Sequence, residues 1–195
     1  MVSPAAERGR VVRERLLKAA VELIPERGWT AVSTRTLAER AGVTPSVVHY
    51  HFPSLSSLLN EAATGQMSKM LAGLNELMES APSPAEAIET MLTSVQEYTG
   101  ADTASLLFIE AYLASTRDDD LRERIARSAA EFRRRFGEWL EQHEVPAPFE
   151  TAAVLAASVD GLLLHRGLGL TANDPSAVLR RLLSTSPEEE RQCEQ

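Results

Sequence analysis

Apolar residues recur along this chain at the three- and four-residue spacing that places side chains on one face of a helix. In the first such stretch, Val12, Leu16, Ala20 and Leu23 follow one another at steps of four, four and three. Convincing alternation of apolar and polar residues, the pattern of strands, does not appear in the sequence. The spacing and its breaks predict nine helices over about residues 7–27, 34–41, 45–52, 55–78, 85–98, 103–116, 121–143, 149–168 and 175–183. We therefore expect an all-α fold.

Two of these helices are short, and the residues at their ends predict where they begin and stop. Ser33 is the expected N-cap of the helix over 34–41, and Gly42 is expected to end it. Thr44 is expected to cap the next helix. Pro45 then occupies its first position, where the missing N–H is not needed.

The connection Ala41-Gly42-Val43-Thr44 gives these two helices the spacing of a helix-turn-helix. Val43 and Val48 are expected to hold the second helix against the first, so that the second helix can lie in the major groove of DNA. A generic helical hairpin with a glycine turn has the same spacing, so the spacing alone leaves both interpretations open.

Composition excludes several classes of protein. The chain has 195 residues, of which 44% are hydrophobic and 25% charged, as in ordinary globular proteins. Its single cysteine, Cys193, excludes a disulfide framework and a cysteine-rich zinc site. The polar start lacks a signal core, and no stretch approaches the ~20 apolar residues of a membrane span. We therefore expect a soluble, cytoplasmic protein that does not enter a membrane.

Charge is distributed unevenly around a net value of −8. Residues 1–52 hold eight Lys and Arg against five Asp and Glu, whereas the remaining residues hold 12 against 23. A basic head on an acidic body favours DNA binding at one end, because phosphate affinity depends on local cations. Chance asymmetry on solvated surfaces is the alternative.

The residues that follow the first helix carry a family resemblance. The segment Ser33-Thr34-Arg35-Thr36-Leu37-Ala38-Glu39-Arg40-Ala41-Gly42-Val43-Thr44, then 48–54, Leu58-Leu59 and the upstream Gly28-Trp29, closely resembles the TetR/AcrR family of repressors. The match covers roughly the first sixty residues, and the remainder resembles the family in helix count and length. The resemblance implies a helix-turn-helix domain at 1–53, a helical ligand-binding and dimerisation domain at 54–186 and a flexible tail at 187–195. The expected protein is a repressor that binds a palindromic operator in double-stranded DNA and is released by a small apolar or amphipathic effector. An activator remains an alternative.

The resemblance places the DNA contacts at Ser33, Thr34, Arg35, Thr44, Pro45, Ser46, Val47, His49, Tyr50 and His51. An arginine such as Arg35 can pair bidentately with guanine, although pairing with Glu39 one turn later is an equal alternative. For Tyr50 the alternative is a half-buried aromatic. Two positions depart from the family: His49 stands where a tyrosine is usual, and Leu55 where a lysine is usual, which removes one phosphate contact.

Later helices offer material for an effector pocket. Apolar pockets edged by few polar groups suit small molecules, and the candidate ligand-binding residues are Met67, Met70, Leu74, Met91, Val95, Tyr98, Phe108, Tyr112, Phe132, Phe136, Trp139 and Asp160. Plain core packing is the alternative for the methionines and aromatics. Asp160 lies in an otherwise apolar helix, so it is expected to contact ligand, cap a neighbouring element or pair with His165 or Arg166.

The last two helices resemble the family's four-helix dimer seam. The expected homodimer interface consists of Ala152, Ala156, Val159, Leu163, Gly167, Leu179, Leu182 and Leu183. Dimerisation is also a mechanical requirement, because two recognition helices must lie about 34–36 Å apart to enter successive major grooves.

The sequence also bears on two other classes of function. An enzyme is disfavoured because the sequence has no glycine-rich phosphate loop and no nucleophile motif, and its four histidines show no metal-ligand spacing. We therefore expect no catalytic residues, no metal and no cofactor. The second alternative is a helical small-molecule-binding or partner-binding protein with weak or lost DNA binding, which Leu55 and the acidic balance support.

Overall fold

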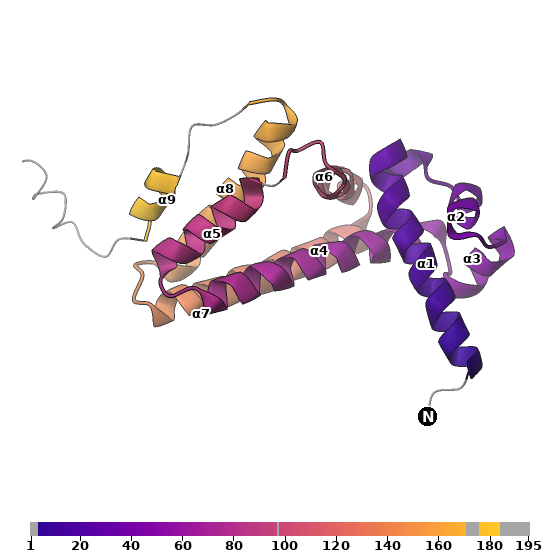
Figure 1. Cartoon of the computed structure of the whole chain (residues 1–195), viewed down its shortest axis with the longest axis horizontal. Helices are drawn as coiled ribbons and strands as arrows, with labels where there is room; N and C mark the ends of the chain where they lie inside the picture. The colour runs from indigo at the N-terminus through magenta and orange to yellow at the C-terminus, as the bar shows by residue number, and fades with distance from the viewer. Residues whose placement is uncertain (1–3, 97, 171–175, 184–195) are drawn as a thin grey trace, which may run out of the picture. The chain divides into compact units, whose positions relative to one another are not determined.

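The computed structural model describes residues 4–96, 98–170 and 176–183, apart from the side chains of 5, 95, 96 and 176. Within these ranges the chain forms nine α-helices and no strand (Figure 1). The helices are α1 (Pro4–Arg27), α2 (Thr34–Ala41), α3 (Pro45–His51), α4 (Leu55–Ser80), α5 (Pro84–Gln96), α6 (Thr103–Ser115), α7 (Asp119–Gln142), α8 (Pro148–Gly167) and α9 (Ser176–Arg181). One 3-10 turn, η1 (Trp29–Ala31), follows α1. The predicted all-α fold of nine helices is confirmed.

The ends of α2 follow from the sequence as expected. The Ser33 hydroxyl accepts a hydrogen bond from the Thr36 N–H at 3.2 Å, and the Thr36 hydroxyl accepts one from the Ser33 N–H at 3.0 Å. Each side chain therefore satisfies a backbone donor that the helix start leaves open. Gly42 ends the helix with a φ of 63°, which a side chain would strain.

The start of α3 differs in one respect from the prediction. Thr44 occupies the N-cap position in extended backbone, but its side chain makes no capping hydrogen bond. Its hydroxyl instead lies 2.9 Å from the Ser46 hydroxyl. Pro45 at the first helical position removes one of the donors that a cap would satisfy, which lessens the need for it.

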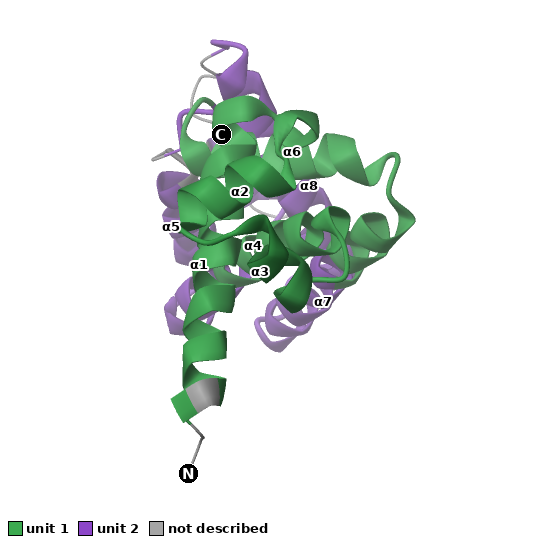
Figure 2. Ribbon diagram, turned by 90° about the vertical axis from the view of Figure 1, so that its right-hand side faces the viewer, with its two compact units in different colours: residues 1–70, 101–127 green, residues 71–100, 128–195 purple. Residues whose placement is uncertain are grey.

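Contacts divide the chain into two compact units (Figure 2). Unit 1 consists of residues 1–70 and 101–127, and unit 2 of residues 71–100 and 128–195. Helices α4 and α7 therefore contribute residues to both units. Unit 1 extends past the expected boundary at residue 53, because α6 packs against α1. The expected division by function at 53 and 54 remains a prediction, and the expected tail at 187–195 lies outside the described residues.

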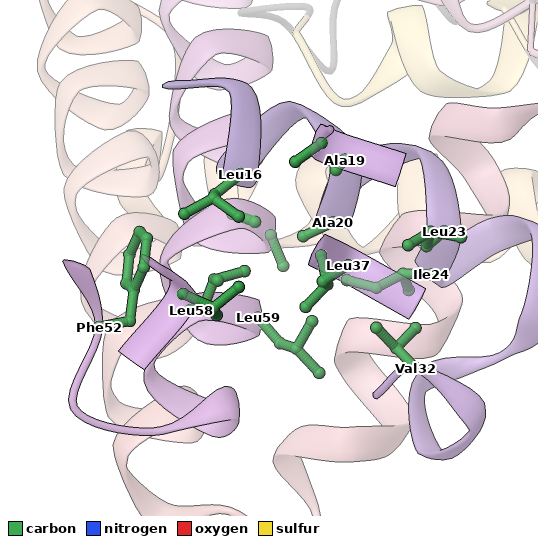
Figure 3. Close-up of a cluster of buried hydrophobic side chains, with 14 of the residues drawn as sticks. Leu16, Ala19, Ala20, Leu23, Ile24, Val32, Leu37, Phe52, Leu58 and Leu59 are labelled. Carbon is green, nitrogen blue, oxygen red and sulfur yellow. The ribbon is translucent and has the colours of Figure 1, made fainter. Parts of the chain in front are cut away.

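The core of unit 1 joins the helix-turn-helix to its neighbours (Figure 3). Helix α1 packs against α2 and α6, and α2 packs against α3. Leu16 and Ile24 of α1, Leu37 of α2 and Leu58 of α4 are completely buried in this cluster. Burying each such side chain stabilises the fold by about 1.5–3 kcal/mol relative to leaving it exposed. Helices α1, α2 and α3 and the first half of α4 thus share one core, and together they are called the head below.

Unit 2 has its own apolar core. Phe132, Phe136 and Trp139 follow one face of α7. The ring centroids of Phe132 and Phe136 are 5.9 Å apart, and those of Phe136 and Trp139 are 6.5 Å apart. Met91 of α5 and Leu155 of α8 are buried in the same cluster. Each unit therefore buries enough apolar surface to hold its helices together.

Candidate nucleic-acid interface

The turn between α2 and α3 presents one face of α3 outwards. The Val43 N–H donates to the Ala38 carbonyl at 2.9 Å, which closes the turn on α2. Val48 is buried in the unit 1 core, and Phe52 at the end of α3 is buried with it. These two anchors fix the inner face of a seven-residue helix, and the other side chains of α3 are exposed or half-buried.

The predicted DNA-binding residues all reach the surface of this head. Seven are exposed, namely Ser33, Arg35, Thr44, Pro45, Ser46, His49 and Tyr50. The other three, Thr34, Val47 and His51, are half-buried. The structure thus brings the set together on the first turn of α2, the turn and α3, while contact of each residue with DNA remains a prediction.

Tyr50 is a large aromatic side chain that α3 leaves exposed. It is 84% exposed and touches His51 edge-on, with ring centroids 5.1 Å apart and planes at 87°. The alternative of a half-buried structural aromatic is therefore wrong. An aromatic ring held in water on a recognition helix is available to stack or to donate from its hydroxyl.

Arg35 is exposed in the first turn of α2. Among the residues that the structure describes, Arg35 forms no ion pair with Glu39. The alternative role of Arg35 as a partner of Glu39 within α2 is therefore not observed. The Arg35 guanidinium is open to a phosphate or a base edge.

Other arginines of the head are engaged within it. Arg40 of α2 donates to Glu22 at 3.2 Å and to Glu26 at 2.6 Å on α1. The hydrogen bond from Arg40 lowers the pKa of the Glu26 carboxyl below its ordinary value. Arg15 donates to the Ala41 carbonyl at the end of α2. These bonds fasten α2 to α1. Arg15 and Arg40 were counted among the basic residues that favour DNA binding, but both are engaged within the head.

Arg13 fastens the end of α3 in the same way. It pairs with Glu61 of α4, and its guanidinium lies 4.6 Å from the centroid of the Phe52 ring. Some of the excess basic residues of the head therefore hold its helices together rather than face DNA. Sequence spacing gave no sign of this pair, because Arg13 and Glu61 are 48 positions apart.

Leu55, which stands where a phosphate-binding lysine is usual, packs half-buried against the unit 1 core. The hydroxyl of Ser54 accepts from the Ser57 N–H at 3.0 Å and caps α4. Any contact of this turn with phosphate therefore falls to main-chain N–H groups rather than to a side-chain cation.

A shallow hollow of about 300 Å³ lies between α1 and α2. Its lining consists of Arg15, Lys18, Ala19, Glu22, Glu39, Arg40, Ala41 and Gly42. Charged side chains of both signs line it, so it does not match the apolar effector pocket that the sequence predicts.

The predicted effector residues are divided between the two units. Met67 belongs to the unit 1 core and Phe108 packs against it, whereas Met70 is half-buried and Tyr112 is exposed. In unit 2, the structure brings Met91, Phe132, Phe136 and Trp139 together, with Leu74 against them. Tyr98 is half-buried, and its carbonyl accepts from Arg166 at 3.3 Å. The side chain of Val95 lies outside the described residues. A ligand role for any of these residues remains a prediction.

Asp160 reaches the surface of unit 2 on α8. Partial burial of its carboxyl raises the pKa of Asp160, and the positive charge of Arg133 opposes that rise. A ligand role for Asp160 remains a prediction.

The residues of the predicted dimer interface differ in burial within the single chain, and the interface itself remains a prediction. Ala152, Leu179 and Leu183 are buried inside unit 2, whereas Ala156, Val159 and Leu163 are half-buried and Gly167 and Leu182 are exposed. Large apolar side chains are exposed on α8, on α9 and just after each of these helices. They are Phe149, Val154, Leu164, Leu168, Leu170, Val178 and Leu182. Both faces of α8 are apolar in sequence, so periodicity could not decide which one the fold already covers.

Two polar residues of unit 1 were missed by the sequence. Glu110 of α6 accepts a hydrogen bond from the Trp29 N–H at 2.7 Å, just after α1 ends. Asn60 of α4 is only 2% exposed and donates to Asp118 and Asp120 near the start of α7. Neither residue stands in a motif, and their partners are more than fifty positions away.

Comparison with known protein families accounts for the helix-turn-helix and for the helices that follow it. Residues 16–62 match the model of bacterial regulatory proteins of the tetR family, and residues 82–186 match that of the tetracyclin repressor-like C-terminal domain. The chain belongs to the TetR family. It is a transcriptional regulator with a DNA-binding helix-turn-helix, as the resemblance of the first sixty residues implied.

Relatives within the TetR family agree with this assignment. The HTH-type transcriptional regulator BetI of Brucella canis is 25% identical over 180 residues, which are 90% of each chain. A putative transcriptional regulator of Streptomyces coelicolor A3(2) is 32% identical, with a TM-score of 0.71 over 89% of this chain and 99% of that one. The multidrug binding protein EbrR, solved with proflavin, is 30% identical, with a TM-score of 0.61 over 88% and 99%. No helix within the described part of this TetR-family chain is long and apolar enough to span a bilayer.

Proposed function

We propose that this chain is a ligand-responsive repressor that binds a palindromic operator as a homodimer and is released by a small apolar or amphipathic effector. The observation that carries the proposal is the outer face of α2 and α3, where Arg35 and Tyr50 are exposed while Arg13, Arg15 and Arg40 are engaged inside the head. Side chains left open on a rigid recognition element are available to DNA.

Within this face, the roles follow from chemistry. Arg35 presents the planar donor pair that matches guanine O6 and N7. Ser33 and Thr34 lie at the start of α2, where free N–H groups and hydroxyls suit a phosphate. Ser46, His49 and Tyr50 extend from α3 towards the same groove, with His49 able to donate to a phosphate in the place of the usual tyrosine.

The exposed apolar row of α8 and α9 supports a homodimer. Val154, Leu164 and Leu168 of the α8 segment and Val178 and Leu182 of the α9 segment are solvent-exposed in the single chain. A two-fold pairing of the same row on two copies would remove these side chains from water, as isologous interfaces do. The palindromic operator follows from that symmetry.

The effector class is supported by the core of unit 2 and by one relative. Met91, Phe136 and Trp139 form an apolar, partly adaptable cluster. EbrR is described as a multidrug binding protein in complex with proflavin. We therefore propose that flat or amphipathic molecules of that kind enter unit 2, with the carboxyl of Asp160 as a candidate for their polar end. The proposal includes no catalytic step, metal or cofactor, and it places the protein with the chromosome in the cytoplasm.

Fluorescence anisotropy with a labelled fragment of the DNA flanking its own gene tests the proposal. We expect saturable binding at low salt, affinity that falls as salt rises, and release of the fragment by proflavin or a related dye. The rival function is a helical small-molecule-binding or partner-binding protein with weak or lost DNA binding, which the half-buried Leu55 in place of a lysine favours. Dye binding without saturable DNA binding at low salt would establish that rival.

A further inference from the structure

One buried amide joins α4 to the start of α7 inside unit 1. Asn60 Nδ2 donates to Asp118 Oδ2 at 3.1 Å and to Asp120 Oδ2 at 3.2 Å. Asp118 directly precedes α7, and Asp120 lies in its first turn. The amide therefore connects two helices across 58 and 60 positions of sequence.

Both carboxylates are themselves held in place. Asp118 Oδ1 accepts from the Leu121 N–H at 2.9 Å and so caps α7. Asp120 Oδ2 also accepts from Arg124 Nε at 2.9 Å, and these bonds from Arg124 and Asn60 lower the pKa of the Asp120 carboxyl. Because the acceptors belong to the helix start, Asn60 holds the first turn of α7 rather than a loose connection.

The other end of the same amide is unsatisfied. Asn60 Oδ1 is buried and has no hydrogen-bond partner among the residues that the structure describes. A buried acceptor without a partner costs free energy, and an apolar side chain of the same size would avoid that cost. The stability gained from the two hydrogen bonds to Asp118 and Asp120 is therefore offset in part by this cost. What asparagine supplies is the direction of its two N–H bonds, in the way that buried polar groups can fix one arrangement at the expense of stability.

The turn of α4 that carries Asn60 is fastened to the DNA-binding head. Leu58 and Leu59 are buried in the unit 1 core. The next residue, Glu61, pairs with Arg13, whose guanidinium lies over Phe52 at the end of α3. This turn is therefore continuous with the recognition helix through packed side chains and an ion pair.

We propose that Asn60 is a positioning residue for operator binding, which holds the first turn of α7 to the DNA-binding head through Asp118 and Asp120. The inference rests on the proposed DNA-binding function. Helices α4 and α7 are the two whose residues are divided between the units. A rearrangement that reaches the first turn of α7 is passed to the head at this amide, and loss of the amide changes how the head is held.

The full chain with Asn60→Leu tests the role of the amide. We expect the apparent Kd for the operator fragment to rise about tenfold, while the melting temperature changes little because loss of the two hydrogen bonds and removal of the unsatisfied carbonyl offset each other. Gln66→Leu is the matched control, an amide-to-leucine change on the same helix, and it should leave the Kd unchanged. Wild-type affinity in Asn60→Leu overturns the proposal. A clear fall in its melting temperature also does, because the residue is then simply structural.

Asn60→Asp provides a second readout that a folding defect does not imitate. It places a third carboxyl beside Asp118 and Asp120, whose negative charges raise the pKa of the introduced group. Arg124 and Arg127 act on Asp120 from α7, Glu61 next to Asn60 is paired with Arg13, and Asp119 between the two acceptors is paired with Arg122. At pH 8 the ionised group repels its neighbours and breaks the contact, whereas near pH 5.5 its protonated form donates a hydrogen bond in place of the amide.

The affinity of Asn60→Asp relative to wild type is therefore expected to improve by about tenfold from pH 8 to pH 5.5, and that of Asn60→Leu to stay constant. The ratio to wild type removes every effect of pH on binding that all three proteins share. A constant ratio for Asn60→Asp overturns the proposal. If wild type itself does not bind the fragment, the proposed function fails; if wild type binds and the variants bind equally well, only the role of Asn60 fails.

Discussion

The guanidinium of Arg13 lies 4.6 Å from the centroid of the Phe52 ring while it pairs with Glu61. One side chain of α1 thus contacts the residue that ends α3 and a residue of the second turn of α4. The position of the recognition helix therefore depends on an arginine that faces inwards rather than towards DNA.

Arg13→Ala removes both contacts. We expect a loss of about 1 kcal/mol in the free energy of unfolding, since a partly exposed cation–π contact and an exposed ion pair are each worth a fraction of that. Arg122→Ala is the control, because Arg122 pairs with Asp119 on the surface of α7 without an aromatic partner. Urea unfolding of both variants measures the difference, and equal stabilities would contradict the structural role of Arg13.

Gly137 is required by a close approach within unit 2. A Cβ at this position would lie 2.4 Å from Cδ1 of Phe149, at the start of α8. Gly137→Ala should therefore lower stability by about 1 kcal/mol. Gly65→Ala, also inside a helix but with nothing within 4 Å of the added carbon, should raise it by about 0.5–1 kcal/mol. Thermal unfolding compares the two, and stabilisation of both would show that Phe149 does not restrict the site.

Acid should weaken the bond between α1 and α2. The hydrogen bond from Arg40 lowers the pKa of Glu26 below its ordinary value of 4.5. A carboxyl whose pKa is lower in the folded than in the unfolded state contributes stability above the unfolded pKa, and this contribution disappears as the pH falls through the folded pKa. The difference in melting temperature between wild type and Arg40→Ala should thus be constant above about pH 5 and shrink below it. A difference that grows in acid would contradict the pairing.

The exposed row of α8 and α9 makes a prediction about assembly. Leu168 is 74% exposed in the single chain, so Leu168→Asp has little effect on folding but places a charge in the proposed seam. Sedimentation should show a dimer for wild type and a monomer for Leu168→Asp. Val11→Asp, which changes an exposed apolar residue of α1, should remain dimeric. A dimeric Leu168→Asp would place the seam elsewhere.

Local features of the fold were predictable because each depends on neighbouring residues. Ser33 and Gly42 set the ends of α2 as expected, since caps and left-handed turns act within four residues. Thr44 was a partial failure, because Pro45 removes a donor and Ser46 offers its hydroxyl a nearer partner.

Contacts distant in sequence were not predictable. The contacts of Asn60 with α7 and of Arg13 with α4 join residues far apart in the chain, and charge counts cannot show which cations are already paired. Ala152 shows the same limit for packing, because both it and Val154 lie on apolar faces of α8 and only the fold decides which is covered.

The salt dependence of operator affinity in Arg35→Ala tests the central claim most directly. Lys69→Ala is the matched control, because it removes the same charge from an exposed position of α4, about 20 Å along the helix from its first turn. We predict that Arg35→Ala weakens binding and flattens the slope of log K against log salt by about one unit per half-site, while Lys69→Ala binds as wild type does. Equal affinity and slope for Arg35→Ala and Lys69→Ala would contradict the assignment of α2 and α3 as the DNA-reading face.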